Sequence, residues 1–227
     1  MDKLPKSHIK AYFVSGLGGD RRLFASIELP EYVEPVYLDW IPALKQESLK
    51  EYAYRLGAAI PNQEPCILVG LSMGGMIVTE LANIKNCQKL ILISSTPTSN
   101  GLPFWYRWAG GIKAEKWVPL SFIKAGSLLK RFFSTESGNE KELLRDMIRN
   151  TKAEHLRWSM SAIIHWKQSE FPQSIVHIHG SKDRIIPIRL LRPTHVIPGA
   201  GHLMILQQSE RINEILEAEL SGLNKTF

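Results

Sequence analysis

The sequence is poor in cysteine and has no long hydrophobic run. Its 227 residues include two cysteines, Cys66 and Cys87, which make no disulfide framework and match no zinc-ligand spacing. The first residues, MDKLPKSHIKAYFV, lack the apolar segment of a secretory signal, and no stretch of about 18 apolar residues could span a bilayer. These absences argue against a disulfide-stapled secreted domain and against a membrane protein. We therefore expect a cytoplasmic protein without membrane binding.

The net charge is +6, and most of the excess lies in the middle of the chain. Residues 98–170 hold 12 Lys and Arg against 7 Asp and Glu. These basic residues are scattered rather than clustered in runs, so we predict no nucleic-acid binding. A solvated helical surface is the simpler interpretation, and a face that attracts an acidic partner is the alternative.

Short apolar runs alternate with helical patterns at both ends of the chain, and the runs predict buried strands. The predicted strands cover 9–14, 34–38, 66–69, 89–93, 175–178 and 194–197. The predicted helices between and after them cover 21–26, 48–59, 73–84 and 203–221. This rhythm predicts an α/β fold, with a mostly parallel, doubly wound sheet of about six strands and helices on both faces.

The alternation stops after Ser94 and resumes at Ile175. Within this interval, residues 97–170 hold helix-like stretches and ten of the twenty aromatic residues, including five of the six tryptophans. We predict a helical lid at residues 97–170, inserted between two parts of one core, residues 1–96 and 171–227.

An aromatic stripe, Phe104-Trp105-Tyr106-x-Trp108, lies near the start of this predicted lid. Such a stripe suits the core of the lid, and contact with a substrate is the alternative. Trp105 and Trp108 are the candidates for that contact.

The segment Gly70-Leu71-Ser72-Met73-Gly74 lies between a predicted strand and a predicted helix. An abrupt strand-to-helix turn would strain Ser72 and raise its hydroxyl above the sheet edge. Gly70 and Gly74 fit because a Cβ at either position would collide with neighbouring backbone. The helix would point the positive end of its dipole at developing negative charge. Ser72 is therefore a candidate nucleophile, and a serine in an ordinary glycine-rich turn is the alternative.

A serine nucleophile needs a base that is oriented by an acid. His202 follows the last predicted strand, and Asp183 follows the strand at 175–178. Both would lie outside the carboxyl ends of strands, where sites of open α/β sheets assemble. The chain has only five aspartates, and no Asp or Glu follows the strand that ends at Ile93. We therefore expect His202 as base and Asp183 as acid.

Acyl transfer also needs donors for an oxyanion. The backbone N–H of Met73 can supply one, and we place the second at the Leu17 N–H, in the glycine-rich loop after the first strand. This loop lacks the last glycine of a dinucleotide fingerprint and is not followed by a phosphate-binding lysine, so we expect no nucleotide cofactor. His177 and His179, two apart on a strand, could resemble a metal pair, but we expect no metal.

The chain resembles the α/β-hydrolase superfamily, and its small lidded carboxylesterases, between Ala11 and Leu220. Three motifs carry the resemblance, in this order: the strand–GLSMG–helix unit, HGSKDRIIP and GAGH. The resemblance implies one set of roles. Ser72 would be the nucleophile, His202 the general base and then acid, and Asp183 the orienting acid, with Leu17 and Met73 as oxyanion donors and no cofactor.

We accordingly expect a serine hydrolase that forms an acyl-enzyme from a small-molecule carboxylic ester or thioester with a hydrophobic acyl part. One alternative comes from a resemblance to the carboxylesterases that demethylate acyl-carrier-protein esters in biotin synthesis. There the basic lid would bind an acidic carrier protein. A non-hydrolytic, lyase-type member of the same fold is the other alternative, because fold does not determine function.

Overall fold

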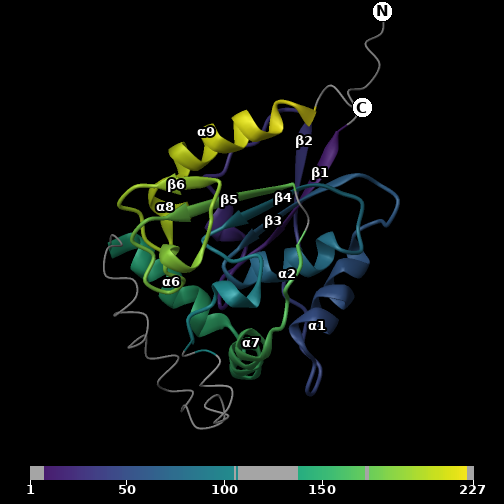
Figure 1. Ribbon diagram of the computed structural model, residues 1–227. Helices are drawn as coiled ribbons and strands as arrows, with labels where there is room; N and C mark the ends of the chain where they lie inside the picture. Colours follow the sequence, from purple (N-terminus) through teal and green to yellow (C-terminus); the bar gives the residue numbers. More distant parts are fainter. Residues whose placement is uncertain (1–7, 105, 107–137, 172–173, 224–227) are drawn as a thin grey trace, which may run out of the picture.

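Six strands form one sheet in the order β2-β1-β3-β4-β5-β6 (Figure 1). The computed structural model describes residues 8–104, 106, 138–171 and 174–223, and every strand pair within them is parallel. The strands are β1 (Ile9–Val14), β2 (Val33–Tyr37), β3 (Cys66–Leu71), β4 (Cys87–Ile93), β5 (Ile175–Gly180) and β6 (His195–Ile197). The predicted α/β sheet of about six strands is confirmed.

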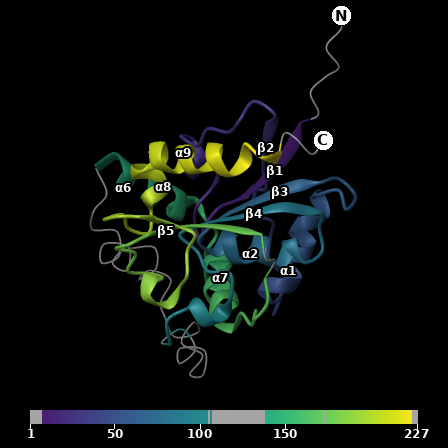
Figure 2. The same cartoon turned by 45° about the horizontal axis from the view of Figure 1, so that its top comes forward.

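Helices cover both faces of the sheet (Figure 2). Successive side chains of a strand point to opposite faces of the sheet, so neighbouring residues of β1 pack against helices on opposite faces. Phe13 packs in the cluster that includes α8 (Met204–Gln207) and α9 (Ser209–Leu220). Tyr12 packs in the cluster that includes α1 (Leu49–Leu56) and α2 (Met73–Ala82). The sheet is therefore doubly wound, as predicted.

The helix ends differ in detail from the prediction. The segment at 21–26 forms only a 3-10 helix, η1 (Arg21–Phe24), and the segment at 48–59 forms α1 followed by the 3-10 turn η2 (Gly57–Ala59). The expected single helix at 203–221 is wrong, because Gln208 has φ −128° and ψ 29° and divides it into α8 and α9. Among the helices that are described, none is both long and apolar enough to cross a membrane.

The described part of the predicted insertion is helical. It contains η3 (Ser99–Gly101), α6 (Gly138–Asn150) and α7 (Ala153–His165), and no strand is found in its described residues. Trp105 and Trp108 lie outside the described residues. The boundaries of the insertion, and its role as a lid, remain predictions.

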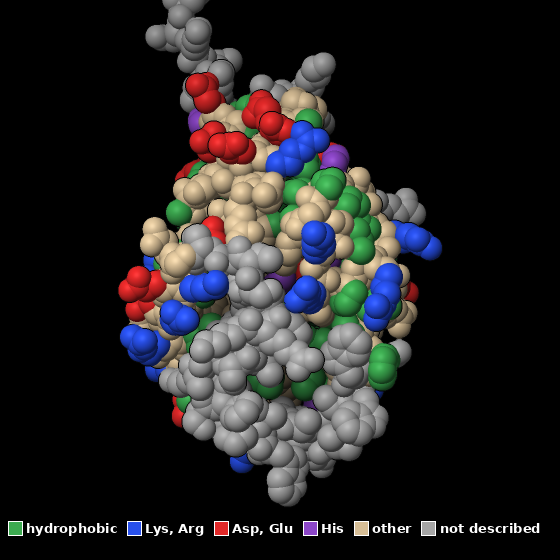
Figure 3. Space-filling view, turned by 90° about the vertical axis from the view of Figure 1, so that its left-hand side faces the viewer, with side chains coloured by type: hydrophobic (Ala, Val, Ile, Leu, Met, Phe, Trp, Pro, Cys, Tyr) green, Lys and Arg blue, Asp and Glu red, His purple; other side chains and the backbone are tan. Residues whose placement is uncertain are grey.

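The strand order determines where a site can form. β1 lies between β2 and β3, so the chain adds strands first on one side of β1 and then on the other. The loops after β1 and β3 therefore leave in different directions, and open a crevice at the carboxyl edge of the sheet. Figure 3 views the molecule from the side toward which β5 runs in Figure 1.

Candidate active site

Ser72 occupies a strained turn between β3 and α2. Its φ of 53° and ψ of −120° are unusual for a residue with a side chain, and its N–H donates to the Ile93 carbonyl at 3.0 Å. A Cβ on Gly70 would lie 2.5 Å from the Gly74 carbonyl oxygen, and one on Gly74 would lie 2.1 Å from the Val14 carbonyl oxygen. Both predicted glycine requirements are therefore confirmed, and at Gly74 the close neighbour is strand β1.

The imidazole of His202 joins Ser72 to Asp183. His202 lies in the loop between β6 and α8 and is only 6% exposed. Its Nδ1 lies 2.7 Å from Asp183 Oδ2, and its Nε2 lies 2.9 Å from Ser72 Oγ. An ionised carboxylate can only accept, so Nδ1 carries the proton and Nε2 is left to accept from the serine hydroxyl. The structure thus brings the three predicted residues together.

The Asp183 carboxylate is held by its own loop as well. Its Oδ1 accepts from the N–H groups of Ile185 and Ile186, at 2.8 and 2.9 Å. Burial alone raises the pKa of Asp183, but the electrostatic interaction and hydrogen bond with His202, together with the interaction with His179 and the Ile186 N–H, outweigh it. The pKa therefore lies below its usual value. The carboxylate is ionised at neutral pH and can orient the imidazole.

Backbone contacts tie the Asp183 loop to the His202 loop. The Lys182 N–H donates to the Ala200 carbonyl at 2.8 Å, and the Gly199 N–H donates to Ser181 Oγ at 2.8 Å. The separation of acid and base is therefore set by hydrogen bonds between the two loops as well as by the contact between Asp183 and His202 themselves.

The loop after β1 lies against the nucleophile. A Cβ on Gly16 would be 3.2 Å from Ser72 Cβ, and Leu17 lines the same cavity as Ser72. Met73 is the first residue of α2. Among the described residues, no hydrogen-bond acceptor faces the N–H of Leu17 or of Met73. Neither N–H donates to a described residue, so the arrangement fits their predicted role, which remains a prediction.

A cavity of about 260 Å³ opens beside Ser72 and His202. Much of its wall comes from the two described helices of the insertion, with Leu144 and Ile148 on α6 and Leu156, Met160 and Ile163 on α7. Our sequence analysis missed these wall residues, although the helical spacing on α7 could have indicated them. A larger groove of about 1110 Å³, between residues 42–50 and α7, holds none of the three site residues.

The sequence matches the alpha/beta hydrolase family over residues 12–215. The chain belongs to this family. No curated protein matches the sequence.

Solved structures share the fold at low sequence identity. An esterase from Thermogutta terrifontis is 18% identical with a TM-score of 0.66, over 96% of this chain and 91% of its own. An esterase from Exiguobacterium antarcticum is 17% identical with a TM-score of 0.70, over 95% and 93%. MenH from S. aureus is 14% identical with a TM-score of 0.70, over 94% of both chains. At these identities the comparisons establish the α/β-hydrolase fold alone.

Behind the site of this α/β-hydrolase family member, a buried histidine supports the serine turn. His177 Nε2 donates to the Ser95 carbonyl at 3.0 Å, and Ser95 Oγ donates to the Ser72 carbonyl at 2.6 Å. Burial, with a smaller effect of His179, lowers the pKa of His177 to about 4. His177 is therefore neutral at neutral pH and acts as a hydrogen-bond donor.

His179 supports the acid. Its Nε2 donates to the Ile186 carbonyl at 2.8 Å and lies 3.3 Å from Asp183 Oδ2. Burial lowers the pKa of His179, and the charge of Asp183 only partly opposes this. Within the described residues, no three potential metal ligands lie together. The positions of His177 and His179 are explained by hydrogen bonds to the backbone of the site.

Proposed function

We propose that this protein is a serine hydrolase that cleaves a carboxylic ester or thioester with a hydrophobic acyl group. One observation carries the proposal. A continuous hydrogen-bonded path runs from Ser72 Oγ through His202 to the buried Asp183 carboxylate, beside a largely apolar cavity. A hydroxyl aligned in this way can be activated as a nucleophile.

In the proposed acylation, Ser72 Oγ bonds to the carbonyl carbon while its proton passes to His202 Nε2. Asp183 stabilises the imidazolium that forms. The N–H groups of Leu17 and Met73 donate to the carbonyl oxygen as it becomes negative. The bond to the leaving alcohol or thiol then breaks, and the leaving group takes the proton from His202.

Water completes the proposed cycle. His202 removes a proton from the water as its oxygen attacks the acyl-enzyme carbonyl, and then returns that proton to Ser72 Oγ as the acid leaves. The apolar walls on α6 and α7 favour a hydrophobic acyl group, because burial of each methylene adds binding free energy.

The test is hydrolysis of 4-nitrophenyl butyrate by the Ser72→Ala variant. We expect kcat/KM to fall by at least about 1000-fold, as in other enzymes that lose such a nucleophile. Ser161→Ala is the matched control, because Ser161 lines the other groove and should leave the rate unchanged. Full activity of Ser72→Ala would contradict the proposal. Release of both acid and alcohol separates hydrolysis from a lyase-type reaction.

We also propose, on the basis of charge, that an acidic carrier protein presents the substrate. An acidic carrier protein would suit the basic segment at 98–170, of which residues 107–137 lie outside the described residues. Such docking would weaken as salt rises. Equal turnover of free and carrier-bound methyl esters, without a salt effect, would contradict it.

A further inference from the structure

A basic residue lines the candidate cavity. Among the described lining residues, Arg184 is the only Lys, Arg, Asp or Glu. Arg184 is exposed, which places it at the mouth of the cavity, whereas the walls on α6 and α7 are apolar. Tyr106 also lines the cavity, and its phenol adds no charge, because burial and the nearby Asp183 raise its pKa to about 12.

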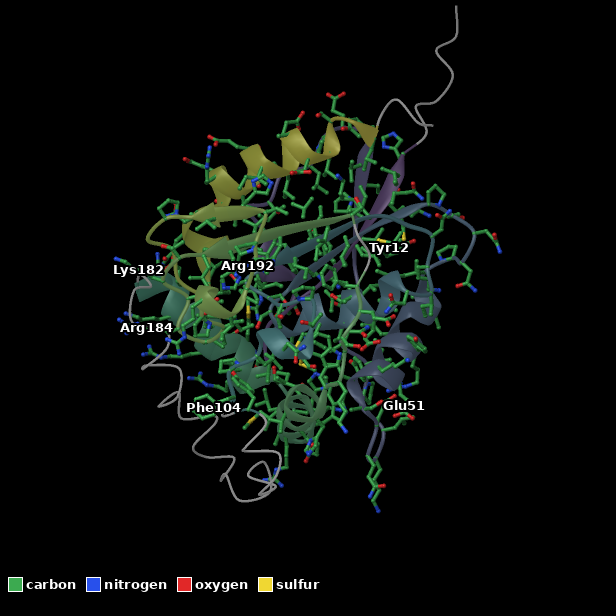
Figure 4. The ribbon with its side chains drawn as sticks, viewed as in Figure 1. Tyr12, Glu51, Phe104, Lys182, Arg184 and Arg192 are labelled. Atoms are coloured by element: carbon green, nitrogen blue, oxygen red, sulfur yellow. The ribbon has the colours of Figure 1, made fainter. Side chains whose placement is uncertain are left out.

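The fold of the Asp183 loop explains the position of Arg184. The N–H groups of Ile185 and Ile186 both turn back to Asp183 Oδ1. The chain therefore curls around the buried carboxylate, and the side chain of the intervening Arg184 is left on the outside. Figure 4 places Arg184 and Lys182 at the edge of the molecule toward which β5 runs.

The positive charge of this loop has no carboxylate partner among the residues that the structure describes. In the described part of the chain, no carboxylate forms an ion pair or hydrogen bond with Arg184, Lys182, Arg189 or Arg192. The one acid of residues 181–192 is Asp183, which is buried against His202. Figure 3 shows Lys and Arg side chains around this side of the molecule, while many of the acidic side chains lie at its upper end.

We propose that Arg184 is a subsite for an anionic group, a carboxylate or phosphate, carried by the ester substrate. The inference rests on the proposed function and narrows its substrate class. A guanidinium matches the geometry of both anions and can bind them with two parallel hydrogen bonds. The apolar wall beside it reduces screening by water, and the three neighbouring cations attract the anion during approach. The substrate is therefore apolar near the reacting carbonyl and negatively charged at one end.

Two pairs of substrates test whether the anionic group lies on the acyl part of the ester or on its leaving group. In the first pair the anion is on the acyl side, with 4-nitrophenyl hemiglutarate compared with the neutral 4-nitrophenyl hexanoate. In the second it is on the leaving group, with S-butyryl-4′-phosphopantetheine compared with S-butyryl-pantetheine. For one pair, we expect wild-type kcat/KM to be about tenfold higher for the anionic member, and to lose this advantage at high salt.

Variants distinguish direct binding of the anion by Arg184 from attraction by the overall positive charge of the loop. In Arg184→Gln, the anionic-to-neutral ratio of kcat/KM should fall to about one, whereas Arg184→Lys should retain part of it. Arg189→Gln is the matched control, because Arg189 is exposed on the same loop but does not line the cavity. The Arg189→Gln variant should keep most of the wild-type anionic-to-neutral ratio of kcat/KM. A wild-type ratio near one for both pairs, or equal losses in Arg184→Gln and Arg189→Gln, would overturn the subsite.

Binding without turnover keeps this inference distinct from the proposed function. The Ser72→Ala variant, with and without Arg184→Gln, is titrated with each intact substrate in a calorimeter. Tighter binding of the anionic member that disappears with Arg184→Gln supports the subsite, even if the wild type hydrolyses none of these esters. Equal binding of both members overturns it, even if both esters are hydrolysed.

Discussion

His179 Nε2 lies 3.3 Å from Asp183 Oδ2, the same oxygen that lies 2.7 Å from His202 Nδ1. One carboxylate oxygen therefore faces two imidazoles. His179 is kept neutral because burial lowers its pKa, and its single N–H is directed at the Ile186 carbonyl, 2.8 Å away. We interpret His179 as a positioning residue that holds the Asp183 turn without adding a charge.

Removal of the His179 donor should lower kcat more than it raises KM. In His179→Leu, the buried Ile186 carbonyl loses its partner and the Asp183 turn can shift. We expect kcat for 4-nitrophenyl butyrate to fall about 10- to 100-fold, because small misplacements of reacting groups are costly. His179→Gln can still donate to the carbonyl and should recover most of the rate. A uniform loss in both variants, or a change confined to KM, would contradict a positioning role.

Protonation of His177 should destabilise the fold in acid. The pKa of His177 is about 4 in the folded protein, against 6.5 for an unperturbed histidine, because of burial. The unfolded chain therefore binds a proton more readily, so this contribution is favourable above pH 6.5 and is lost as the pH falls toward 4. The shift corresponds to roughly 3 kcal/mol in the free energy of unfolding.

Urea unfolding at pH 7 and pH 4.5 measures this effect. The variant His177→Gln retains a donor toward the Ser95 carbonyl but cannot titrate. Its free energy of unfolding should fall less between the two pH values than that of the wild type. Identical losses in the two proteins would show that His177 does not contribute to acid sensitivity.

Gly74→Ala should be severely destabilising. The added Cβ would lie 2.1 Å from the Val14 carbonyl oxygen and 2.4 Å from that of Ser15, and both contacts are with backbone. We expect a loss of more than about 3 kcal/mol, or no soluble protein, because neither β1 nor the turn can move alone. Gly138→Ala is the control, since no described residue lies within 4 Å of its added Cβ. Comparable melting temperatures for the two variants would contradict this packing.

Chain-length preference should follow the α7 wall. For the wild type, kcat/KM should rise about fourfold per methylene while the acyl chain still fits the cavity. Met160→Trp places a larger side chain in that wall, so the rise should stop at a shorter chain. A series of 4-nitrophenyl esters from acetate to decanoate measures this. An unchanged optimum would mean that the acyl group does not lie along α7.

The sequence alone determined the order of the six strands, because short apolar runs and glycine-rich turns are local features, but it did not divide the last helical segment into α8 and α9. It also indicated Ser72, Asp183 and His202, since each follows a strand and parallel strands end at one edge of a sheet. Their catalytic roles remain predictions, but the structure places them within hydrogen-bond distance.

Only the tertiary structure decided what surrounds these three residues. His177 and the Ser95 carbonyl are 82 positions apart in the chain, and the cavity wall on α7 faces a turn formed by β3 and α2. That no described acidic residue pairs with Arg184 likewise depends on which side chains come near it in space. No local pattern encodes such contacts, because they arise when distant segments pack on the same edge of the sheet.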